Sequence, residues 1–344
     1  MTQTHDTAVC IGRFQLLHNA QLALIRRALE LAPKCVVVIG SAHQARSPKN
    51  PFTWQERADM VRLALAENER ARTVFVPVRD FYDQERWVQA VRKEVVQAAG
   101  GDQARVVLVG HRKDPTSEYL NNFPAWELDD PGLQGDLHAK ALRAALFATP
   151  SMPAALAAIA GQVPPSTVEF LRAWTQLPFF EQLRDGWQQL AAEHDRWADS
   201  PYPPVFVTVD ALVRMGDHVL LIRRGRAPGR GLLALPGGFI EQRETVYQSA
   251  LRELAEETGL RLLPSEMATA LKEVRVFDHP DRSQRGRVIT HAHYFAFGAR
   301  MLPEIIGSDD AADAMWVPIA QLTSLEDQFH DDHFHMLDAF LGLT

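Results

Sequence analysis

The chain has 344 residues, 46% of them hydrophobic and 23% charged, which is the composition of a globular protein long enough to form two domains. Its formal net charge is -7 and no basic run occurs, so we do not expect nucleic acid as a partner. We do not expect membrane association or secretion either, because no apolar run reaches about 18 residues and the first residues lack a signal-peptide pattern.

The two cysteines, Cys10 and Cys35, lie in apolar, strand-like runs. This placement favours buried thiols in a reducing compartment over a disulfide framework. We therefore expect a cytoplasmic protein. A homo-oligomer is compatible with the sequence, but no pattern in it indicates the oligomeric state.

The first 150 residues alternate apolar, strand-like runs with helix-like stretches. The strand-like runs lie at 8–12, 35–42, 73–78 and 106–111, and the helix-like stretches lie near 19–32, 54–66 and 85–99. Buried strands separated by helices predict an α/β domain with a doubly wound parallel sheet. Such sheets bind ligands at the carboxyl ends of their strands. The first turn, GRFQLLHNAQ at 12–21, leads into a helix with His18 near its start, which is a favourable place for an anion.

That turn and three later segments, at 40–57, 79–87 and 110–127, resemble nucleotidylyltransferases, specifically nicotinamide mononucleotide (NMN) adenylyltransferases. The resemblance implies that the GRFQ turn and the histidines hold ATP phosphates, while residues 110–126 help to hold the pyridine nucleotide. The residues that it assigns to substrate binding are Gly12, Arg13, Phe14, His18, Gly110, His111, Arg112, Trp126 and Arg143. For His18 the alternative is a capping or packed histidine, and for the arginines it is a surface ion pair.

The chain departs from that family at two motifs. The family's H-x-G-H motif reads His18-Asn19-Ala20-Gln21 here, so a neutral amide replaces the second histidine. The later S-S-T-x-x-R motif keeps only Arg143, and Lys140 can supply a point charge but no hydroxyl. Loss of one transition-state donor costs roughly 10²–10³ in rate, so we expect adenylyl transfer to be weak or absent.

Residues 151–199 combine an Ala-rich run with amphipathic stretches, so we expect them to close the first domain or to build an interface. Their large apolar side chains are Trp174, Phe179, Phe180, Leu183 and Trp187. The sequence SPYPP at 200–204 ends this polar helical region and precedes a strand-like run, which indicates a boundary. The predicted domains are 1–199 and 200–344.

After this boundary, strand-like runs lie at 205–213, 218–224, 271–277, 287–297 and 315–317, and helical segments lie near 318–324 and 332–342. This order predicts an α+β sandwich, with a mixed sheet and one acidic helix on one side of it. The acidic helix begins at a capping box of Thr245 and Gln248 and ends at Gly259. We expect its apolar stripe to pack on the sheet; the stripe consists of Tyr247, Leu251, Leu254 and Thr258.

Glu253, Glu256 and Glu257 share one face of this helix, because positions i, i+3 and i+4 project together. Such carboxylates repel one another, and a hard divalent cation, Mg²⁺ or Mn²⁺, converts the repulsion into coordination. Gly237 and Gly238 precede the helix and allow the backbone to approach phosphate oxygens. For an isolated motif of this kind, the alternative is a solvated helix face on which Arg252 pairs with Glu256.

The stretch from 238 to 260 matches every specified position of the Nudix box, G-x5-E-x7-R-E-U-x-E-E-x-G-U, where U is apolar. The resemblance to Nudix hydrolases implies cleavage of a nucleoside diphosphate linked to a further group. It makes Glu253, Glu256 and Glu257 the metal ligands, Arg252 the residue that orients a glutamate, and Glu244 an auxiliary acid. The catalytic base is a box glutamate or a residue on a distant loop. Asp309 and Asp310 are candidates for such a loop base, with an exposed acidic turn as the alternative.

The segment at 276–295 resembles the corresponding part of ADP-ribose pyrophosphatases. Arg282, Arg285 and Arg287 would contact the diphosphate or the ribose, and solvated loop arginines are the alternative. ADP-ribose is therefore the expected substrate, with AMP and ribose 5-phosphate as products. NMN, NAD and ATP are the further small-molecule ligands that the first domain would take. Both domains in this order resemble a bifunctional family of NMN adenylyltransferases that end in a Nudix domain.

A histidine-rich segment near the C-terminus, with His330, His333 and His335, suggests zinc at first sight. We favour a structural interpretation, because the segment lies at a helix start, where aspartate is a common cap.

Three functions remain open: a hydrolase with a non-catalytic first domain, a fully bifunctional enzyme, and a non-catalytic sensor. The sensor is disfavoured because all metal-binding carboxylates of the box are present.

Overall fold

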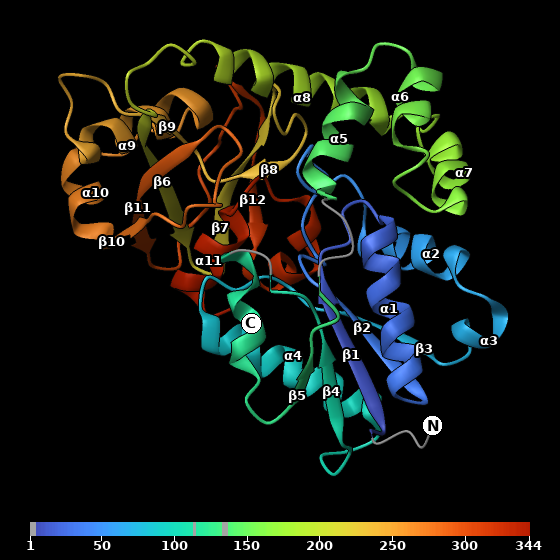
Figure 1. Cartoon of the computed structure of the whole chain (residues 1–344). Helices are drawn as coiled ribbons and strands as arrows, with labels where there is room; N and C mark the ends of the chain where they lie inside the picture. Colours follow the sequence, from blue (N-terminus) through green and yellow to red (C-terminus); the bar gives the residue numbers. More distant parts are fainter. Residues whose placement is uncertain (1–4, 113–114, 133–136) are drawn as a thin grey trace. The chain divides into compact units, whose positions relative to one another are not determined.

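The computed structural model describes residues 5–112, 115–132 and 137–344. The first four residues, used above for the signal-peptide expectation, lie outside the described residues, as do residues 113–114 of the 110–126 stretch. The chain forms two compact units, Met1–Arg184 and Asp185–Thr344 (Figure 1).

The first unit is built on one parallel sheet with the strand order β3-β2-β1-β4-β5. Its strands are β1 (Thr7–Gly12), β2 (Lys34–Ile39), β3 (Thr73–Pro77), β4 (Val106–Val109) and β5 (Glu127–Asp129). Val9 packs with Val91 and Val95 of α4 (Gln84–Ala99), whereas Cys10 donates to the carbonyl of Leu24 in α1 (Asn19–Leu31). Since successive strand residues face opposite sides, α1 and α4 cover opposite faces of the sheet (Figure 1). The predicted doubly wound parallel sheet is confirmed.

The remaining helices of the first unit pack on the sheet or on one another. They are α2 (Trp54–Ala64), α3 (Glu67–Arg70), η1 (Pro115–Asn122), α5 (Ala139–Ala148), α6 (Met152–Ile159), α7 (Pro165–Trp174) and the start of α8 (Phe179–Asp195). The Trp174 ring lies 4.5 Å from that of Phe52, and its Nε1 donates to Glu56 at 3.1 Å. Phe147 and Phe180 stack at 5.8 Å. These aromatic contacts close the first unit, which was one of the two functions expected for residues 151–199.

The second unit contains a mixed sheet with the order β10-β11-β6-β7-β12, to which β8 and β9 add short pairings. The strands are β6 (Val205–Met215), β7 (His218–Arg224), β8 (Leu233–Ala234), β9 (Gly237–Phe239), β10 (Leu271–Phe277), β11 (Arg287–Phe297) and β12 (Ala311–Pro318). β6 and β11 are parallel, and the other pairs are antiparallel.

Both cysteines of the chain lie in the first unit, buried and unpaired.

Helices cover both faces of the mixed sheet. They are α9 (Val246–Thr258), α10 (Pro264–Ala270), η2 (Ile319–Gln328) and α11 (His333–Leu341). Ala211 and Val213 of β6 pack with Leu254 of α9, whereas Leu212 packs with Leu337 of α11. The box helix therefore lies on one side of a mixed sheet, as predicted. Among the described residues, no helix combines the length and the apolar character needed to cross a membrane.

The division between the units falls inside α8, earlier than the boundary expected at 199/200. The residues of α8 after Arg184 belong to the second unit and contact its later segments. Glu193 lies 3.5 Å from Arg285, His194 hydrogen-bonds to the Gln284 carbonyl at 3.1 Å, and the Trp197 ring meets that of Phe206 at 5.8 Å. The two ends of α8 therefore belong to different units. Tertiary contacts decide this assignment, and the periodicity of the helix does not reveal it.

A group of buried polar side chains lies near α11. Arg282 donates through Nε and Nη2 to both carboxylate oxygens of Asp332, at 2.9 and 2.8 Å. His333 Nδ1 accepts from the Leu235 amide at 3.0 Å. The imidazole of His330 is buried against Gly229, where a Cβ atom would lie only 2.3 Å from His330 Nδ1. The histidine-rich segment therefore contributes to packing and to backbone hydrogen bonds.

Burial lowers the pKa of His330 from 6.5 to about 3. Between these values the unfolded chain binds a proton that the folded protein excludes, so stability is lost as the pH falls below 6.5. At about pH 5 the loss from this group is at most about 2 kcal/mol, because one pKa unit corresponds to about 1.4 kcal/mol.

We expect H330Q to reduce the acid-dependent loss of stability, measured by denaturant unfolding of the second unit at about pH 7.5 and about pH 5. The control is H218Q, at a half-buried site beside Asp217. An unchanged difference between the two pH values in H330Q would contradict the assignment, whatever the variant's absolute stability.

Candidate active sites

In the first unit, His18 is the N-cap of α1. Its Nδ1 accepts from the Gln21 amide at 3.4 Å, and the Gln21 side chain accepts in return from the His18 amide at 3.4 Å. The side chain of His18 is buried. His18 therefore lies in the position of a capping, packed histidine. Gln21 completes a reciprocal capping box with it.

Two arginines lie next to this turn, of which Arg57 is buried and Arg143 is partly buried. Arg57 Nη1 donates to the carbonyls of Arg13 and Gly40, both at 2.7 Å, and Arg143 donates to the Gln15 carbonyl. Burial lowers the pKa of each guanidinium to about 10, and the charge of Arg13 acts in the same direction on both. Three positive charges therefore gather at the first turn, an arrangement that an anion would stabilise.

Sequence reasoning missed Arg57, although the quoted segment at 40–57 ends on it. Its side chain is 1% exposed and also donates to Ser41 at 2.9 Å. The only signal available was an arginine at an otherwise apolar position of α2, beside Ala58, Met60 and Val61. Arg57 holds the backbone of the first turn, where Phe14 adopts a φ of 51°.

Most of the other residues expected in the first unit lie near the ends of β1 and β4, and Trp126 lies just before β5. A Cβ at Gly12 would lie 3.1 Å from the Phe14 ring, and one at Gly110 would lie 2.7 Å from Leu120. His111 Nδ1 lies 2.8 Å from Asp130, and Arg112 donates to Asn121 at 2.8 Å. Trp126 stacks on Phe123 at 4.5 Å. Gly12, Gly110, His111 and Arg112 thus lie at the carboxyl edge of the sheet, where such folds bind ligands. Trp126 directly precedes the parallel strand β5 and therefore lies toward the opposite edge.

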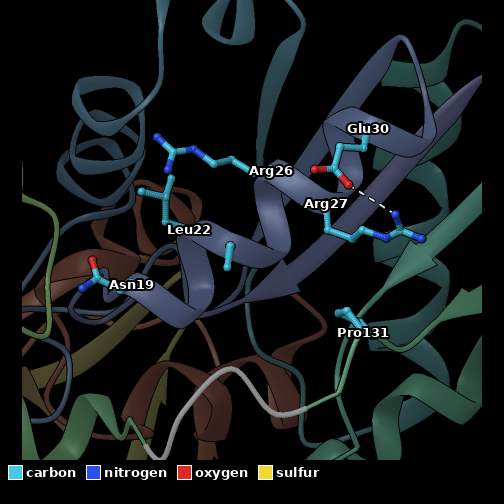
Figure 2. A pocket seen from close by; sticks show the side chains of 7 residues that line it. Asn19, Leu22, Arg26, Arg27, Glu30 and Pro131 are labelled. Atoms are coloured by element: carbon cyan, nitrogen blue, oxygen red, sulfur yellow. Dashed lines mark hydrogen bonds and ion pairs between the residues drawn. The ribbon is translucent and has the colours of Figure 1, made fainter.

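A separate cavity of about 410 Å³ lies along the outer side of α1 (Figure 2). It is lined by Asn19, Leu22, Ala23, Arg26, Arg27, Glu30 and Pro131. Arg27 is held by Asp129 at 2.9 Å and by Glu30 at 3.2 Å. None of the residues predicted to bind substrate lines this cavity.

In the second unit, the ends of the box helix follow the prediction. Thr245 caps α9 by accepting from the Gln248 amide, and the Gln248 side chain accepts from the Thr245 amide at 2.9 Å. Gly259 ends the helix with a φ of 66°. Leu254 and Thr258 are buried, and Tyr247 and Leu251 are partly buried against the same core.

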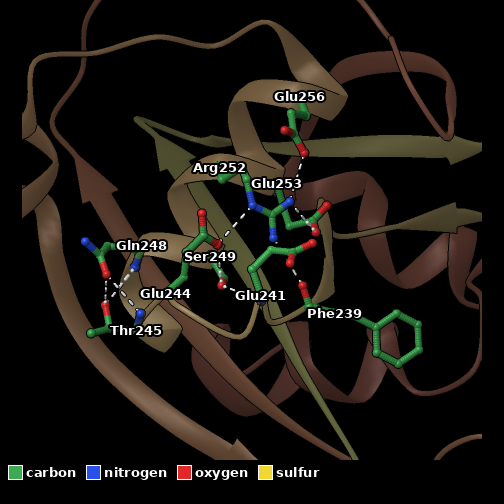
Figure 3. A network of polar contacts seen from close by, with 9 residues as sticks. All are labelled: Phe239, Glu241, Glu244, Thr245, Gln248, Ser249, Arg252, Glu253 and Glu256. Carbon is green, nitrogen blue, oxygen red and sulfur yellow. Dashed lines mark hydrogen bonds and ion pairs between the residues drawn. The ribbon is translucent and has the colours of Figure 1, made fainter.

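The guanidinium of Arg252 is the centre of the acidic cluster (Figure 3). Its Nε donates to Glu244 at 3.0 Å, and Nη1 donates to Glu253 at 2.8 Å and to Glu256 at 2.9 Å. Its Nη2 donates to the Phe239 carbonyl at 3.2 Å. Ser249 also donates to Glu244, at 2.8 Å, and these two donors lower the pKa of the Glu244 carboxyl.

The three glutamates expected to bind metal lie in different environments. The side chain of Glu256 is 47% exposed, that of Glu253 is 13% exposed, and Glu257 is buried. Burial raises the pKa of Glu257 to about 8, and the charge of Glu253 acts in the same direction. Burial also raises the pKa of Glu253. Glu257 accepts from the Gly237 amide at 2.8 Å, which ties the helix to β9.

The expected convergence of all three carboxylates is not observed in the described residues, where no group of three His, Cys, Asp or Glu side chains is placed to hold a metal ion. Helix spacing sets the directions of the Cβ atoms but not the side-chain rotamers. Arg252 draws Glu253 and Glu256 to itself, whereas Glu257 turns toward Gly237. Glu253 and Glu257 still repel each other, and their oxygen donors fit a hard divalent cation.

The glycines before the helix are required by close contacts. A Cβ at Gly238 would lie 2.6 Å from Glu253 Oε1, and one at Gly237 would lie 2.2 Å from the Val209 carbonyl. The space beside Gly238 is therefore filled by the carboxylate of Glu253. The approach of phosphate to these two glycines stays a prediction.

The post-box arginines differ from one another. Arg282 is 6% exposed and paired with Asp332, so burial and this ion pair remove it from the set expected to touch substrate. Arg285 is partly exposed, and its guanidinium lies 5.9 Å from the Phe239 ring. Arg287 lies 3.7 Å from Asp278 and donates to the Asp278 carbonyl.

The two candidates for a loop base are also distinguished. Asp310 pairs with Arg226 at 2.8 Å. Asp309 has a φ of 55° and lies close enough to Glu253 for its charge to raise the pKa of that carboxyl. Of the two, Asp309 is the stronger candidate, because its charge acts on Glu253 whereas Asp310 is paired with Arg226.

Comparisons with known proteins identify both units. A NUDIX domain model matches residues 204–340, and a cytidylyltransferase-like model matches residues 9–125. A nicotinamide/nicotinic acid mononucleotide adenylyltransferase of Acinetobacter baylyi is 33% identical over 181 residues, which are 52% of this chain and 92% of the relative. An ADP-ribose pyrophosphatase of Methanocaldococcus jannaschii is 36% identical over 120 residues, which are 35% of this chain and 65% of the relative.

One solved structure matches both units together. It is a bifunctional NMN adenylyltransferase/ADP ribose pyrophosphatase from Francisella tularensis, complexed with AMP and a manganese ion. The two chains are 32% identical with a TM-score of 0.88, and the match covers 98% of this chain and 99% of that chain. The second unit is thus a Nudix hydrolase domain and the first is an NMN adenylyltransferase-like domain. The chain belongs to the family of bifunctional NMN adenylyltransferase/ADP-ribose pyrophosphatases.

Proposed function

We propose that the Nudix domain hydrolyses ADP-ribose to AMP and ribose 5-phosphate and depends on Mg²⁺ or Mn²⁺. The observation that carries this proposal is the Arg252 network, which gathers Glu244, Glu253 and Glu256 at one end of a capped helix. The similarity to the Methanocaldococcus pyrophosphatase, and the AMP and manganese in the Francisella structure, support the substrate and the metal class.

The residues would divide the work as follows. Glu253, Glu256 and Glu257 hold the cation, and Arg252 orients Glu253 and Glu256. When bound, a divalent cation neutralises phosphate charge and lowers the pKa of the attacking water. Glu244, kept ionised by Ser249 and Arg252, holds Arg252 in place. Gly237, Gly238, Arg285 and Arg287 would contact the diphosphate or the ribose, and Asp309 or a box glutamate would accept the water's proton.

For the first domain we propose substrate binding with weak or lost adenylyl transfer. Arg13, Arg57 and Arg143 supply positive charge for a phosphate such as that of ATP, and residues 110–126 would hold NMN or NAD. Gln21 offers an amide engaged in the helix cap where the family has a histidine. A fully bifunctional enzyme is the second candidate, and the retained arginine cluster favours it. A non-catalytic sensor is disfavoured because the Arg252 network is complete.

Replacing a metal-binding carboxylate should abolish hydrolysis. We expect E256Q and E257Q each to lower the turnover of ADP-ribose by orders of magnitude with Mg²⁺ present, because an amide is a weaker ligand for a hard cation. AMP release, followed by chromatography, is the measurement. The matched control E304Q, at an exposed glutamate of the same domain, should keep the wild-type rate. Near wild-type turnover in both box variants would overturn the assignment.

The contact at Gly238 provides a second test of the same site. In G238A the new methyl group would displace the Glu253 carboxylate, which lies 2.6 Å from the Cβ position. We expect hydrolysis to fall at least tenfold, since displacements of about 1 Å can cost 10²-fold, while the melting temperature stays nearly constant. The control G298A adds a methyl group in open space. Equal activity of G238A and G298A would show that hydrolysis does not require the Glu253 carboxylate in its present position.

Adenylyl transfer is tested with the purified wild-type protein. Incubation with ATP and NMN should give little or no NAD, because Gln21 supplies no positive charge to the transition state. The double variant A20G/Q21H restores the family's motif and should raise NAD formation if the rest of the site is intact. Robust NAD synthesis by the wild-type protein would instead establish the bifunctional alternative.

A further inference from the structure

The carboxyl-terminal end of α9 is held by a segment 50 residues further along the chain, which we call the clamp loop and define as residues 306–310. The last carbonyl groups of a helix have no partner within the helix. Here the amide of Gly259 donates to Ala255, and the clamp loop supplies donors for the next three carbonyls.

Ser308 serves two of these carbonyls with two different donors. Its hydroxyl donates to the carbonyl of Glu256, and its amide donates to the carbonyl of Glu257 at 3.2 Å. The amide of Ile306 donates to the carbonyl of Thr258 at 3.0 Å. Ser308 therefore binds the carbonyls of Glu256 and Glu257, which are consecutive in the chain. The side chain of Glu256 is exposed, whereas that of Glu257 is buried.

The clamp loop is held by these hydrogen bonds rather than by apolar packing. Ile306 is 73% exposed, and Ser308, Asp309 and Asp310 are exposed as well. Gly307 passes so close to β12 that a Cβ would lie 2.5 Å from the Cα of Asp313. The loop is therefore wedged between β12 and the end of α9. Asp309 follows Ser308 directly in the chain and has a φ of 55°.

We propose that Ser308 is a positioning residue of the Nudix site, which fixes the peptide groups of Glu256 and Glu257 and so sets the geometry of the cation site. The expected effect of Ser308 on kcat rests on the proposed metal-dependent hydrolysis of ADP-ribose. Its consequence for cation binding does not require that ADP-ribose be the substrate. Ser308 itself touches neither substrate nor cation; it acts through the backbone of the two glutamates.

The test compares S308A, which removes one of the two donors, with the conservative variant S308T, which keeps a hydroxyl. The matched control is S324A, because the Ser324 hydroxyl also donates to a helical carbonyl, that of Gln321 at 2.7 Å, at a site away from α9. Mn²⁺ affinity of the full chain is measured by titration with EPR detection, ADP-ribose hydrolysis gives kcat and KM, and thermal melting reports stability.

We expect S308A to weaken Mn²⁺ binding about three- to tenfold, which is the effect of one net hydrogen bond. In the same variant kcat should fall by at least as much while KM changes little. S308T should recover most of the affinity, and S324A should match the wild type. The melting temperature of S308A should stay close to that of S324A.

Wild-type Mn²⁺ affinity in S308A would overturn the proposal. It would equally be overturned if S308A and S324A lost affinity and stability in parallel, since Ser308 would then be a general structural residue. Should the wild-type protein bind Mn²⁺ but fail to cleave ADP-ribose, the proposed substrate is wrong, and the Mn²⁺ titrations alone decide the role of Ser308.

Discussion

The Nudix site depends on one positive charge placed among several negative ones. The Arg252 guanidinium donates to three carboxylates and to the Phe239 carbonyl, so it links the end of β9 to the middle of α9. Without it, Glu244, Glu253 and Glu256 would repel one another across a few ångströms. Because arginine presents its donors in a rigid planar fork, it also fixes the directions of the carboxylates that it binds.

Glu256 and Glu257 are equivalent in the sequence motif but differ in burial. Glu257 lies beneath β9 with a single amide donor, and burial raises its pKa, whereas Glu256 is exposed and paired with Arg252. A buried carboxylate close to a second one is costly as long as no cation is bound. Burial, together with the charge of Glu253, thus favours the protonated form of Glu257 in the absence of a cation.

The first turn of the first domain combines positive charge with a polar helix cap. The charge of Arg13, Arg57 and Arg143 at the first turn suits a phosphate group, and Arg57 holds three backbone carbonyls of neighbouring segments. Gln21, at the position of the family's second histidine, is engaged in capping α1. The first turn therefore keeps positive charge, while a neutral amide stands at the position of the family's second histidine.

The sequence by itself determined the two fold types, their order and the ends of the box helix, because these follow from periodicity and from local capping. The alternation of buried runs and helices led to the parallel sheet, and Thr245, Gln248 and Gly259 marked the helix ends. Local patterns cannot decide which side chain is buried or which partner it meets. Arg282 reads as a loop arginine, yet Asp332 holds it in the interior 50 residues away in the chain.

Tertiary structure alone decided the remaining features. Glu253, Glu256 and Glu257 share a helix face, but their side chains have different partners: Arg252 binds Glu253 and Glu256, whereas Gly237 of β9 binds Glu257. The division inside α8 depends on contacts of Glu193 and His194 with a loop 90 residues later. Spacing along one helix specifies only directions from its axis, whereas burial and charge depend on segments that folding brings together from distant parts of the chain.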